Sequence, residues 1–292
     1  MTCPYCGSGR TPLLVYKHRW WVCPGCGNAT SELRADQPGD RLPPWLRDRL
    51  PAPLRLDGAE VVDPARQWFV PEHYAAGSAV GTPYAGEAEA FLRLLAQHDL
   101  SPRGVILDLS GGPGFVAQAL AATADRVVMT DFVPHVVRFA RTRLGVDARF
   151  YDYQGAPLDT VVEGPFDLVL LRYSINHCLD PRVLARALWR LTADGAAVVI
   201  AGFLSPSLGA CLTSALEEAP PRVLWDPDWL AAAFVAAGWQ VAVRFETHPP
   251  MPYWRPRSWR YRVASLPWEL RPGPLPRDVH QHHPGLILRR PR

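Results

Sequence analysis

Four cysteines near the start of the chain are the residues whose type and spacing predict chemistry most directly. They form two pairs, Cys3-Pro-Tyr-Cys6 and Cys23-Pro-Gly-Cys26, each followed by a glycine. Two intervening residues let both thiolates of a pair bind one ion, and four sulfurs satisfy tetrahedral zinc. A redox dithiol or a disulfide is the alternative for a single pair, but the twinned spacing favours zinc. A four-cysteine site is closed, so we expect it to stabilise structure and not to carry a reaction.

A second candidate is the loop Asp108-Leu-Ser-Gly-Gly-Pro-Gly114, which follows an apolar run and precedes a helical pattern. A doubly wound sheet binds its ligand at such a place. The glycines let the backbone approach a ligand closely and adopt positive φ. Residues 112–117 also fit the G-x-G-x-x-A form of a dinucleotide fingerprint. Asp108 argues against a pyrophosphate, which it would repel at the helix N-terminus, and suits a ligand that presents an ammonium group.

A third candidate is the stretch Arg172-Tyr-Ser-Ile-Asn-His177, which ends another apolar run. His177 is the best candidate for a general base, because the ordinary histidine pKa of about 6.5 suits proton removal near neutrality. A histidine that only binds substrate or caps the next segment is the open alternative. We expect Tyr173 to lie against a cationic ligand group or to bind substrate, and Asn176 to orient either side chain.

The elements that must position these residues alternate between strand and helix patterns. Strands are expected at 105–109, 126–129, 148–151, 166–171, 196–201 and 239–245, and helices at 87–98, 115–122, 134–144, 182–191 and 228–237. Continuous apolar strands separated by helices predict an α/β fold with a doubly wound, mostly parallel seven-stranded sheet that is covered on both faces. The seventh strand is either 259–264 or 286–289, and the sequence leaves both open.

The 292 residues divide into three expected parts. Residues 1–33 carry β-prone runs between the cysteine pairs and predict a small zinc-ribbon domain. Residues 34–83 begin with a proline-rich linker and continue into an aromatic segment that we expect to cover the active site. Residues 84–292 predict the catalytic domain, which ends in a basic, aromatic C-terminal segment. A hydrophobic content of 48% allows one full-sized core and this small appendage.

Charge and hydropathy limit the partners. A net charge of +3 is too small to argue for nucleic acid, although arginines and aromatic residues interleave between 244 and 292. That pattern serves single-stranded nucleic acid or packs on a core. No apolar run approaches a membrane span and no signal-like segment opens the chain, so we expect a cytoplasmic protein without a membrane partner. The oligomeric state stays open.

Other cysteines and histidines are expected to be structural or solvated. Cys178 and Cys211 lie in apolar settings and predict buried free thiols, which agrees with a reducing compartment. His280, His282 and His283 stand among prolines and predict a solvated loop.

Residues 100–245 resemble the class I methyltransferases that use S-adenosylmethionine (SAM), because several motifs occur in the family's order. The run from Asp108 to Gly114 is similar to the D-x-G-x-G-x-G signature. Ser110 stands where the first glycine usually falls, and Gly111 and Gly112 complete the loop. The resemblance implies that this loop binds SAM, which has an ammonium group and carries no phosphate, with the Ser110 hydroxyl toward the methionine end.

Other family positions map onto the ends of later strands. The resemblance implies that Asp131 holds both ribose hydroxyls and that Phe132 lies against adenine. It implies that Asp152 accepts the adenine amino group, with Tyr153 beside it. The run 166–177 is similar to the family's stretch that ends in the methyl-transfer pocket. There Arg172 is assigned to the cofactor side, and the residues that follow it to the acceptor side.

The resemblance implies a SAM-dependent methyltransferase with bound SAM and structural zinc, acting on a small molecule such as a secondary metabolite. One alternative is base methylation of ribosomal or transfer RNA, with the ribbon and the basic C-terminal segment binding RNA. Some ribosomal RNA guanine methyltransferases have a similar zinc-bearing domain, although their fourth ligand is commonly a histidine and here it is Cys26.

A second alternative uses SAM without methyl transfer. In methyltransferase-like cyclases the SAM amino nitrogen attacks its own γ-carbon, which forms azetidine carboxylate and releases methylthioadenosine. A non-enzymatic binding module with a degenerate fold is disfavoured, because the acids Asp108, Asp131 and Asp152 are all present.

Overall fold

The computed structural model describes residues 2–9, 11–15, 18–31, 55–56, 59–60, 87–153, 155–203, 223–247 and 283–292. Most of the expected linker and active-site cover lies outside these residues, as do the strand alternative at 259–264, most of the basic aromatic segment, Cys211, His280 and His282. Within the expected linker, β4 (Arg55–Leu56) pairs antiparallel with β5 (Ala59–Glu60).

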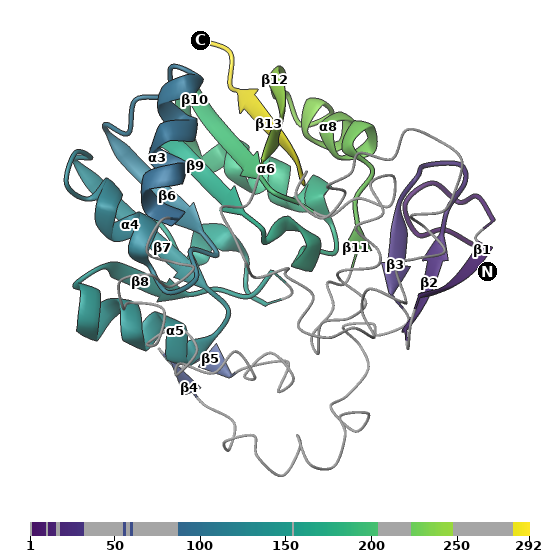
Figure 1. Cartoon of the computed structure of the whole chain (residues 1–292), viewed down its shortest axis with the longest axis horizontal. Coiled ribbons are helices and arrows are strands. Elements are labelled where there is room, and N and C mark those ends of the chain that lie inside the picture. Colours follow the sequence, from purple (N-terminus) through teal and green to yellow (C-terminus); the bar gives the residue numbers. More distant parts are fainter. Residues whose placement is uncertain are drawn as a thin grey trace, which may run out of the picture.

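A seven-stranded sheet forms the centre of the fold (Figure 1). Its strands are β6 (Val105–Leu109), β7 (Arg126–Asp131), β8 (Asp147–Phe150), β9 (Phe166–Arg172), β10 (Thr192–Ala201), β12 (Gln240–Thr247) and β13 (His283–Arg289). In space their order is β12-β13-β10-β9-β6-β7-β8. Only β13 among them runs against its neighbours, β10 and β12. The predicted α/β fold with a mostly parallel sheet is confirmed, and the seventh strand contains 286–289.

Two elements differ from their expected extents. The helix expected over 134–144 is α5 (Pro134–Phe139) followed by a π-helix, η4 (Ala140–Leu144), which ends at Gly145 with a φ of 68°. The fifth strand begins at Thr192 and not at 196, because Thr192 pairs with Phe166 of β9 before the register shifts. Local hydrophobic periodicity does not report either effect, since both depend on backbone pairing.

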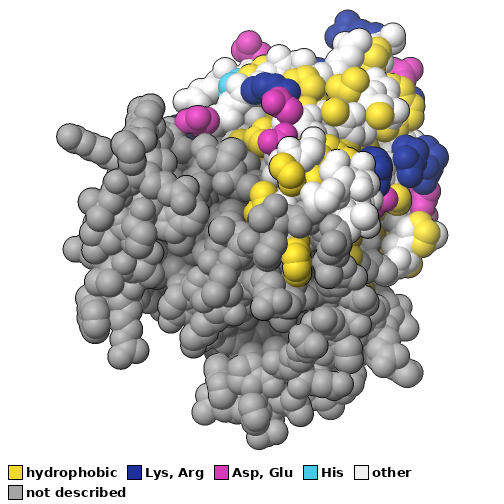
Figure 2. Space-filling view, turned by 90° about the vertical axis from the view of Figure 1, so that its right-hand side faces the viewer, with side chains coloured by type: hydrophobic (Ala, Val, Ile, Leu, Met, Phe, Trp, Pro, Cys, Tyr) yellow, Lys and Arg dark blue, Asp and Glu magenta, His cyan; other side chains and the backbone are white. Residues whose placement is uncertain are grey.

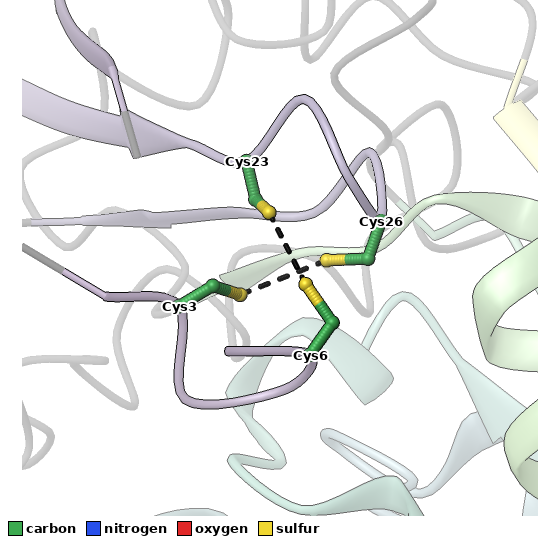
Figure 3. A group of neighbouring side chains, drawn as sticks. All are labelled: Cys3, Cys6, Cys23 and Cys26. Atoms are coloured by element: carbon green, nitrogen blue, oxygen red, sulfur yellow. Dashed lines mark hydrogen bonds between the residues drawn. The ribbon is translucent and has the colours of Figure 1, made fainter. Parts of the chain in front are cut away.

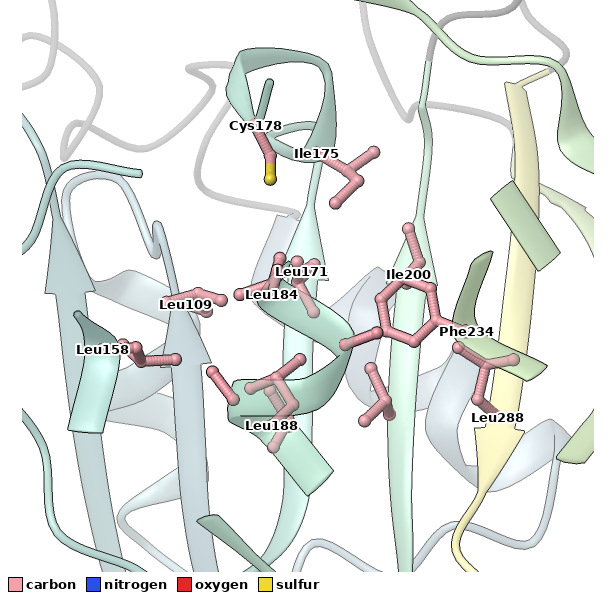
Figure 4. Packing of buried hydrophobic residues seen from close by; sticks show 14 of the residues in the cluster. Leu109, Leu158, Leu171, Ile175, Cys178, Leu184, Leu188, Ile200, Phe234 and Leu288 are labelled. Carbon is pink, nitrogen blue, oxygen red and sulfur yellow. The ribbon is translucent and has the colours of Figure 1, made fainter. Parts of the chain in front are cut away.

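Helices cover both faces of the large sheet (Figure 1). On one face lie α3 (Glu87–Gln97), α4 (Phe115–Leu120) and α5; on the other lie α6 (Pro181–Leu191) and α8 (Pro227–Val235). Alternate residues of β9 serve the two cores, since Leu168 and Leu170 pack with the first set and Val169 and Leu171 with the second. Figure 4 shows the second core, in which Leu188 and Phe234 pack toward the sheet. Full burial of each such side chain contributes about 1.5–3 kcal/mol.

Both helices of the second face start at an Asp-Pro pair. Asp180 accepts a hydrogen bond from the Arg182 amide, and Asp226 accepts hydrogen bonds from the amides of residues 228 and 229. The carboxylate satisfies amides that have no partner within the helix, and the following proline has the φ of a first helical residue. The sequence therefore fixes where α6 and α8 begin.

A second, smaller sheet contains the N-terminal residues. It consists of β1 (Thr11–Val15), β2 (His18–Val22), β3 (Ala29–Ser31) and β11 (Val223–Leu224), in that spatial order. All of its pairings are antiparallel. None of the helices among the described residues has both the length and the apolar character of a membrane span.

Candidate active site and four-cysteine centre

The glycine-rich loop leaves β6 and enters α4 with three residues at positive φ. Ser110, Gly112 and Gly114 have φ values of 61°, 61° and 89°. This conformation suits glycine and is strained for a residue with a Cβ, so Ser110 is the exception. A Cβ added at Gly112 would meet no described atom within 4 Å. The open space beside Gly112 fits a ligand that approaches the backbone closely.

Arg172, the last residue of β9, binds the glycine-rich loop through its guanidinium group. Its Nη2 lies 3.2 Å from Asp108 Oδ2 and donates to the Gly111 carbonyl at 3.0 Å. The side chains of Arg172 and Asp108 are 5% and 0% exposed. The guanidinium carbon also lies 5.5 Å from the centre of the Phe91 ring in α3. The Arg172 guanidinium therefore compensates the buried Asp108 carboxylate and holds the loop to β9.

Asp131 ends β7 and faces the same loop. Its Oδ2 accepts the Gly112 amide at 3.0 Å, and its Oδ1 accepts the Val133 amide at 2.9 Å. Burial raises the pKa of this carboxyl group to about 7, although the two amide hydrogen bonds lower it. A carboxylate has about four acceptor sites, so the hydrogen bonds from Gly112 and Val133 do not exhaust the capacity of this group.

A chain of hydroxyl groups joins three strand ends. Ser110 Oγ donates to the Tyr153 hydroxyl at 3.1 Å, which lies 3.2 Å from Ser174 Oγ. Ser174 Oγ in turn donates to the Leu109 carbonyl at 3.5 Å. The Ser110 hydroxyl is thus engaged within the protein. Asp152, next to Tyr153, is buried at 4% exposure.

The residues after β9 follow the end of the strand that pairs in parallel with β6. Tyr173 has a φ of 52°, a strained value for a tyrosine, and is 39% exposed. Its amide donates to the Ala201 carbonyl at 2.9 Å. Its ring covers Gly202 so closely that a Cβ there would overlap the ring. Neighbouring strands therefore hold this strained tyrosine in place.

A short 3₁₀ helix, η6 (Ile175–His177), follows Tyr173. The His177 ring lies 5.4 Å from the Phe132 ring, with an interplanar angle of 47°. Asn176 is buried, and its Nδ2 donates to the Val223 carbonyl at 2.7 Å. The predicted base thus meets the residue assigned to adenine, whereas the Asn176 amide is engaged with β11.

Comparison with known families decides the broad identity. Residues 84–267, well over half of the chain, match the family described as "Methyltransferase domain". The chain belongs to the SAM-dependent methyltransferases. Both the resemblance stated from its motifs and the enzymatic class are thereby confirmed.

Two curated relatives match part of the methyltransferase. A demethylmenaquinone methyltransferase from Clavibacter sepedonicus is 32% identical over 105 residues, which cover 35% of this chain and 42% of the relative. One from Thermus thermophilus is 31% identical over 110 residues, which cover 36% of this chain and 50% of the relative. The chain therefore spans only about half the length of these relatives.

Solved structures share the fold. Magnesium protoporphyrin IX methyltransferase from Synechocystis PCC 6803 superposes with a TM-score of 0.50 at 13% identity, covering 75% of this chain and 93% of that one. The YcgJ protein from Bacillus subtilis gives 0.51 at 16% identity, covering 70% and 99%. At such low identity the likeness shows the fold alone.

The four cysteines of the methyltransferase converge on one point (Figure 3). Their sulfurs all lie within 4.8 Å of one another, with Cys3 and Cys26 at 3.7 Å and Cys6 and Cys23 at 3.4 Å. A tetrahedron with metal–sulfur bonds of about 2.3 Å has edges of roughly 3.8 Å, whereas a disulfide bond is about 2.05 Å long. All four cysteines are free, and their arrangement fits a tetrahedral zinc site.

The two knuckles that carry these cysteines are built alike. The Gly7 amide donates to the Cys3 carbonyl, and the Gly27 amide donates to the Cys23 carbonyl. Both glycines adopt positive φ, 78° and 73°, as the tight turn requires. Hydrogen bonding to the Ser8 side chain is the main cause that lowers the pKa of Cys6 to about 6. Burial raises the pKa of Cys3 and Cys26.

Most of the predicted site residues of the methyltransferase meet at the carboxyl edge of the large sheet. Direct contacts join these residues in pairs: the loop with Arg172, Asp131 with Gly112, Phe132 with His177, and Tyr153 with Ser110. Sequence reasoning did not single out Ser174 or Phe91, which complete the hydroxyl chain and the Arg172 contact. Ser174 lies within the quoted strand-end stretch, so its position was a usable signal; Phe91 had none, because its contact with Arg172 arises only in the folded chain.

Proposed function

We propose that this methyltransferase uses SAM to methylate a small-molecule acceptor. The observation that carries the proposal is the contact between Phe132 and His177, 5.4 Å between ring centres. It brings the side chain assigned to adenine and the candidate base to one space at the carboxyl edge of β7 and β9. Cofactor and acceptor would therefore meet beside the glycine loop.

The cofactor would be held by side chains at the carboxyl ends of β7 and β8, beside the glycine loop. We assign the ribose hydroxyls to Asp131, because a carboxylate can accept more hydrogen bonds than those it receives from the Gly112 and Val133 amides. Asp152 would accept the adenine amino group, with Phe132 against the ring. The open space at Gly112 would admit the ligand beside the backbone. Bound SAM supplies an electrophilic methyl group on its sulfonium, and its sulfur keeps the bonding electrons when the acceptor takes that methyl.

The acceptor side would be formed by the residues after β9. His177 would accept the proton that an O, N or C nucleophile loses as its bond to the methyl group forms. Tyr173, whose ring lies over Gly202, would contact the cationic sulfur or the acceptor. Asn176, also assigned to this group, would act by holding η6 through its bond to Val223. Much of the rate enhancement would come from positioning.

A small-molecule acceptor is favoured over RNA by two observations. The partial relatives carry names that state a demethylmenaquinone substrate, which is a small molecule. On the face of the molecule that carries the ribbon, acidic and basic side chains of the described residues are interspersed among hydrophobic ones (Figure 2). The described residues on this face therefore do not form the concentrated basic surface that RNA binding calls for.

We also propose that the four-cysteine centre binds zinc in a closed, structural role. Four thiolates complete the tetrahedral shell, so no position is left for substrate or water. We further propose that the chain divides into the zinc ribbon at 1–33, the linker and active-site cover at 34–83, and the methyltransferase domain at 84–292.

The test follows the fate of SAM. The purified protein, with its metal retained, should gain thermal stability with SAM in proportion to the logarithm of its concentration. With methyl-labelled SAM, label should enter a small-molecule extract together with S-adenosylhomocysteine. Label in RNA, with binding that weakens steeply as salt rises, would contradict the acceptor class. Release of methylthioadenosine without acceptor would show the cyclase reaction, and absence of SAM binding would contradict the whole proposal.

A further inference from the structure

The ribbon and the catalytic domain share one sheet. Residues 29 and 30 of β3 pair antiparallel with Leu224 and Val223 of β11, so the three ribbon strands continue into a strand that precedes α8. Leu224 and Val223 are 0% and 1% exposed. In Figure 1 the ribbon strands accordingly lie beside β11. The ribbon is thus docked by backbone hydrogen bonds.

The second cysteine knuckle also contacts the start of α8. Asn28, the residue after the knuckle glycine, is 1% exposed, and its Oδ1 accepts the Asp226 amide at 2.8 Å. The Asn28 carbonyl accepts the Cys23 amide at 2.9 Å. A Cβ on Gly27 would lie 2.7 Å from Asp226 Oδ2. The backbone around Cys23 and the cap of α8 are therefore tightly fitted.

The first knuckle contributes an aromatic contact. Tyr5, between Cys3 and Cys6, packs edge-on to Trp225 with ring centres 5.0 Å apart. It also lies 5.2 Å from Trp229, and the two tryptophans stack at 5.1 Å with an angle of 9°. Aromatic pairs of this kind stabilise a contact beyond their buried area. Both knuckles therefore pack against the segment 223–229.

The same segment holds the turn that carries the candidate base. Trp225 is fully buried, and its Nε1 donates to the Ile175 carbonyl at 3.0 Å. The Val223 carbonyl accepts Asn176 Nδ2 at 2.7 Å. The first bond joins the residue after β11 to η6, and the second joins β11 itself to η6. A continuous set of contacts thus runs from the cysteine centre through 223–226 to Ile175, Asn176 and His177.

We propose that the docked ribbon fixes the position of η6, with Trp225 and Asn176 as positioning residues for His177. The ribbon is then a part of the active-site framework and not a separate arm for recruiting a macromolecule. Loss of metal would loosen both knuckles, and β11 would transmit that change to η6. The consequence for catalysis rests on the proposed function of His177. The coupling between the position of the ribbon and the position of η6 does not depend on that function.

Two tryptophans provide a matched pair of variants. Trp225→Phe keeps an aromatic ring against Tyr5 and removes the N–H bond to η6. Trp239→Phe removes an equivalent buried bond, from Nε1 to the Ala185 carbonyl at 3.0 Å, at a site on α6. Both tryptophans belong to the same core cluster, so the general cost of the substitution is similar in the two variants.

The experiment measures hydrogen exchange of the full chain, with its metal retained and after chelation. We expect the amides of residues 174–178 to exchange roughly three- to tenfold faster in Trp225→Phe, as loss of one hydrogen bond implies. Chelation should accelerate the same peptide, and Trp239→Phe should leave it unchanged. The NMR signal of the His177 imidazole, assigned with His177→Gln, should shift in the first two cases and stay in place in the third.

Three outcomes would overturn the proposal. The first is chelation that accelerates exchange in residues 2–31 only. The second is equal behaviour of the two tryptophan variants at 174–178. The third is an unmoved His177 signal in Trp225→Phe. If chelation unfolds the whole chain, the comparison of Trp225→Phe with Trp239→Phe in the metal-retaining protein still decides. None of these measurements requires SAM, so failure of the proposed function would be seen separately.

Discussion

Arg172 and Asp108 form a buried ion pair beside the glycine loop, with Nη2 3.2 Å from Oδ2 and Nε 3.4 Å from Oδ1. The acidic side chain at the start of the loop therefore has a cation partner from the protein itself. Because Arg172 also binds the Gly111 carbonyl, the pair fixes the loop geometry whether or not a ligand is present. We expect the contribution of Asp108 to cofactor binding to pass largely through this fixed loop.

Removing one partner of this pair should be costly. Arg172→Met leaves a buried carboxylate without its cation, and we expect the free energy of unfolding to fall by about 3–5 kcal/mol. The double variant Asp108→Asn with Arg172→Met should recover part of that loss. Urea denaturation measures both. The exposed pair Arg190 and Asp159, at 2.8 Å, provides the control, since Arg190→Met should cost less than about 1 kcal/mol. Equal costs for the two arginine variants would contradict the role assigned to burial.

Titration of Asp131 should make the stability of the fold and the affinity for SAM depend on pH in opposite directions. Its folded pKa is raised to about 7 from 3.8, chiefly by burial, so the folded state binds the proton more tightly than the unfolded state. The Asp131 contribution to stability is therefore greatest below about pH 4 and is lost as pH rises to about 7. Ribose hydroxyls donate to the ionised form, so SAM affinity should rise across the same range.

The Asp131→Asn variant isolates this effect. The free energy of unfolding of the wild type, minus that of the variant, should decrease by a few kcal/mol between pH 4 and pH 8. Calorimetric titration with SAM should show an affinity that increases with pH only in the wild type. A constant difference in stability over this range would show that Asp131 does not titrate there.

Ser110 combines a strained backbone with a useful hydroxyl group. Ser110→Ala keeps the φ of 61° and loses the bond to Tyr153, so it should destabilise the fold by about 0.5–1.5 kcal/mol. Ser110→Gly loses the same bond but relieves the strain, and should be about 1 kcal/mol more stable than Ser110→Ala. Because the hydroxyl is engaged with Tyr153, SAM affinity should stay within about twofold in both. A large loss of affinity in both variants would instead place the hydroxyl on the cofactor.

Two single cysteine variants test the assignment of the metal ligands. Cys23→Ser removes one of the four sulfurs and should lower bound zinc, measured by elemental analysis, well below one ion per chain. Thermal stability should fall as well, because metal-binding free energy contributes to folding. Cys178→Ser changes a thiol that is buried in the core away from the cluster, and should retain the zinc. Unchanged zinc content in Cys23→Ser would refute the ligand assignment.

The general architecture was predictable because its signals are local. Apolar runs at 105–109 and 166–171 identify buried strands by composition, and the Asp-Pro pairs at 180 and 226 mark helix starts. The acids Asp108, Asp131 and Asp152, at or just after the carboxyl ends of β6, β7 and β8, could be placed at one edge because parallel strands end together. The α-helix expected over 134–144 is longer than α5. The change to a π-helix at Ala140 leaves no mark in the sequence, because the side-chain pattern stays apolar and basic.

The sequence by itself determined the features that depend on covalent spacing and short periodicity: the four-cysteine site, the glycine loop, and the strand and helix alternation of a SAM-dependent methyltransferase. The tertiary structure decided which distant residues meet. Asp108 finds Arg172, 64 positions away, and Asn28 finds Asp226, 198 positions away. Such partners are chosen by burial and backbone pairing once the sheet has assembled, because a buried charge or amide must be satisfied by whatever lies beside it in space.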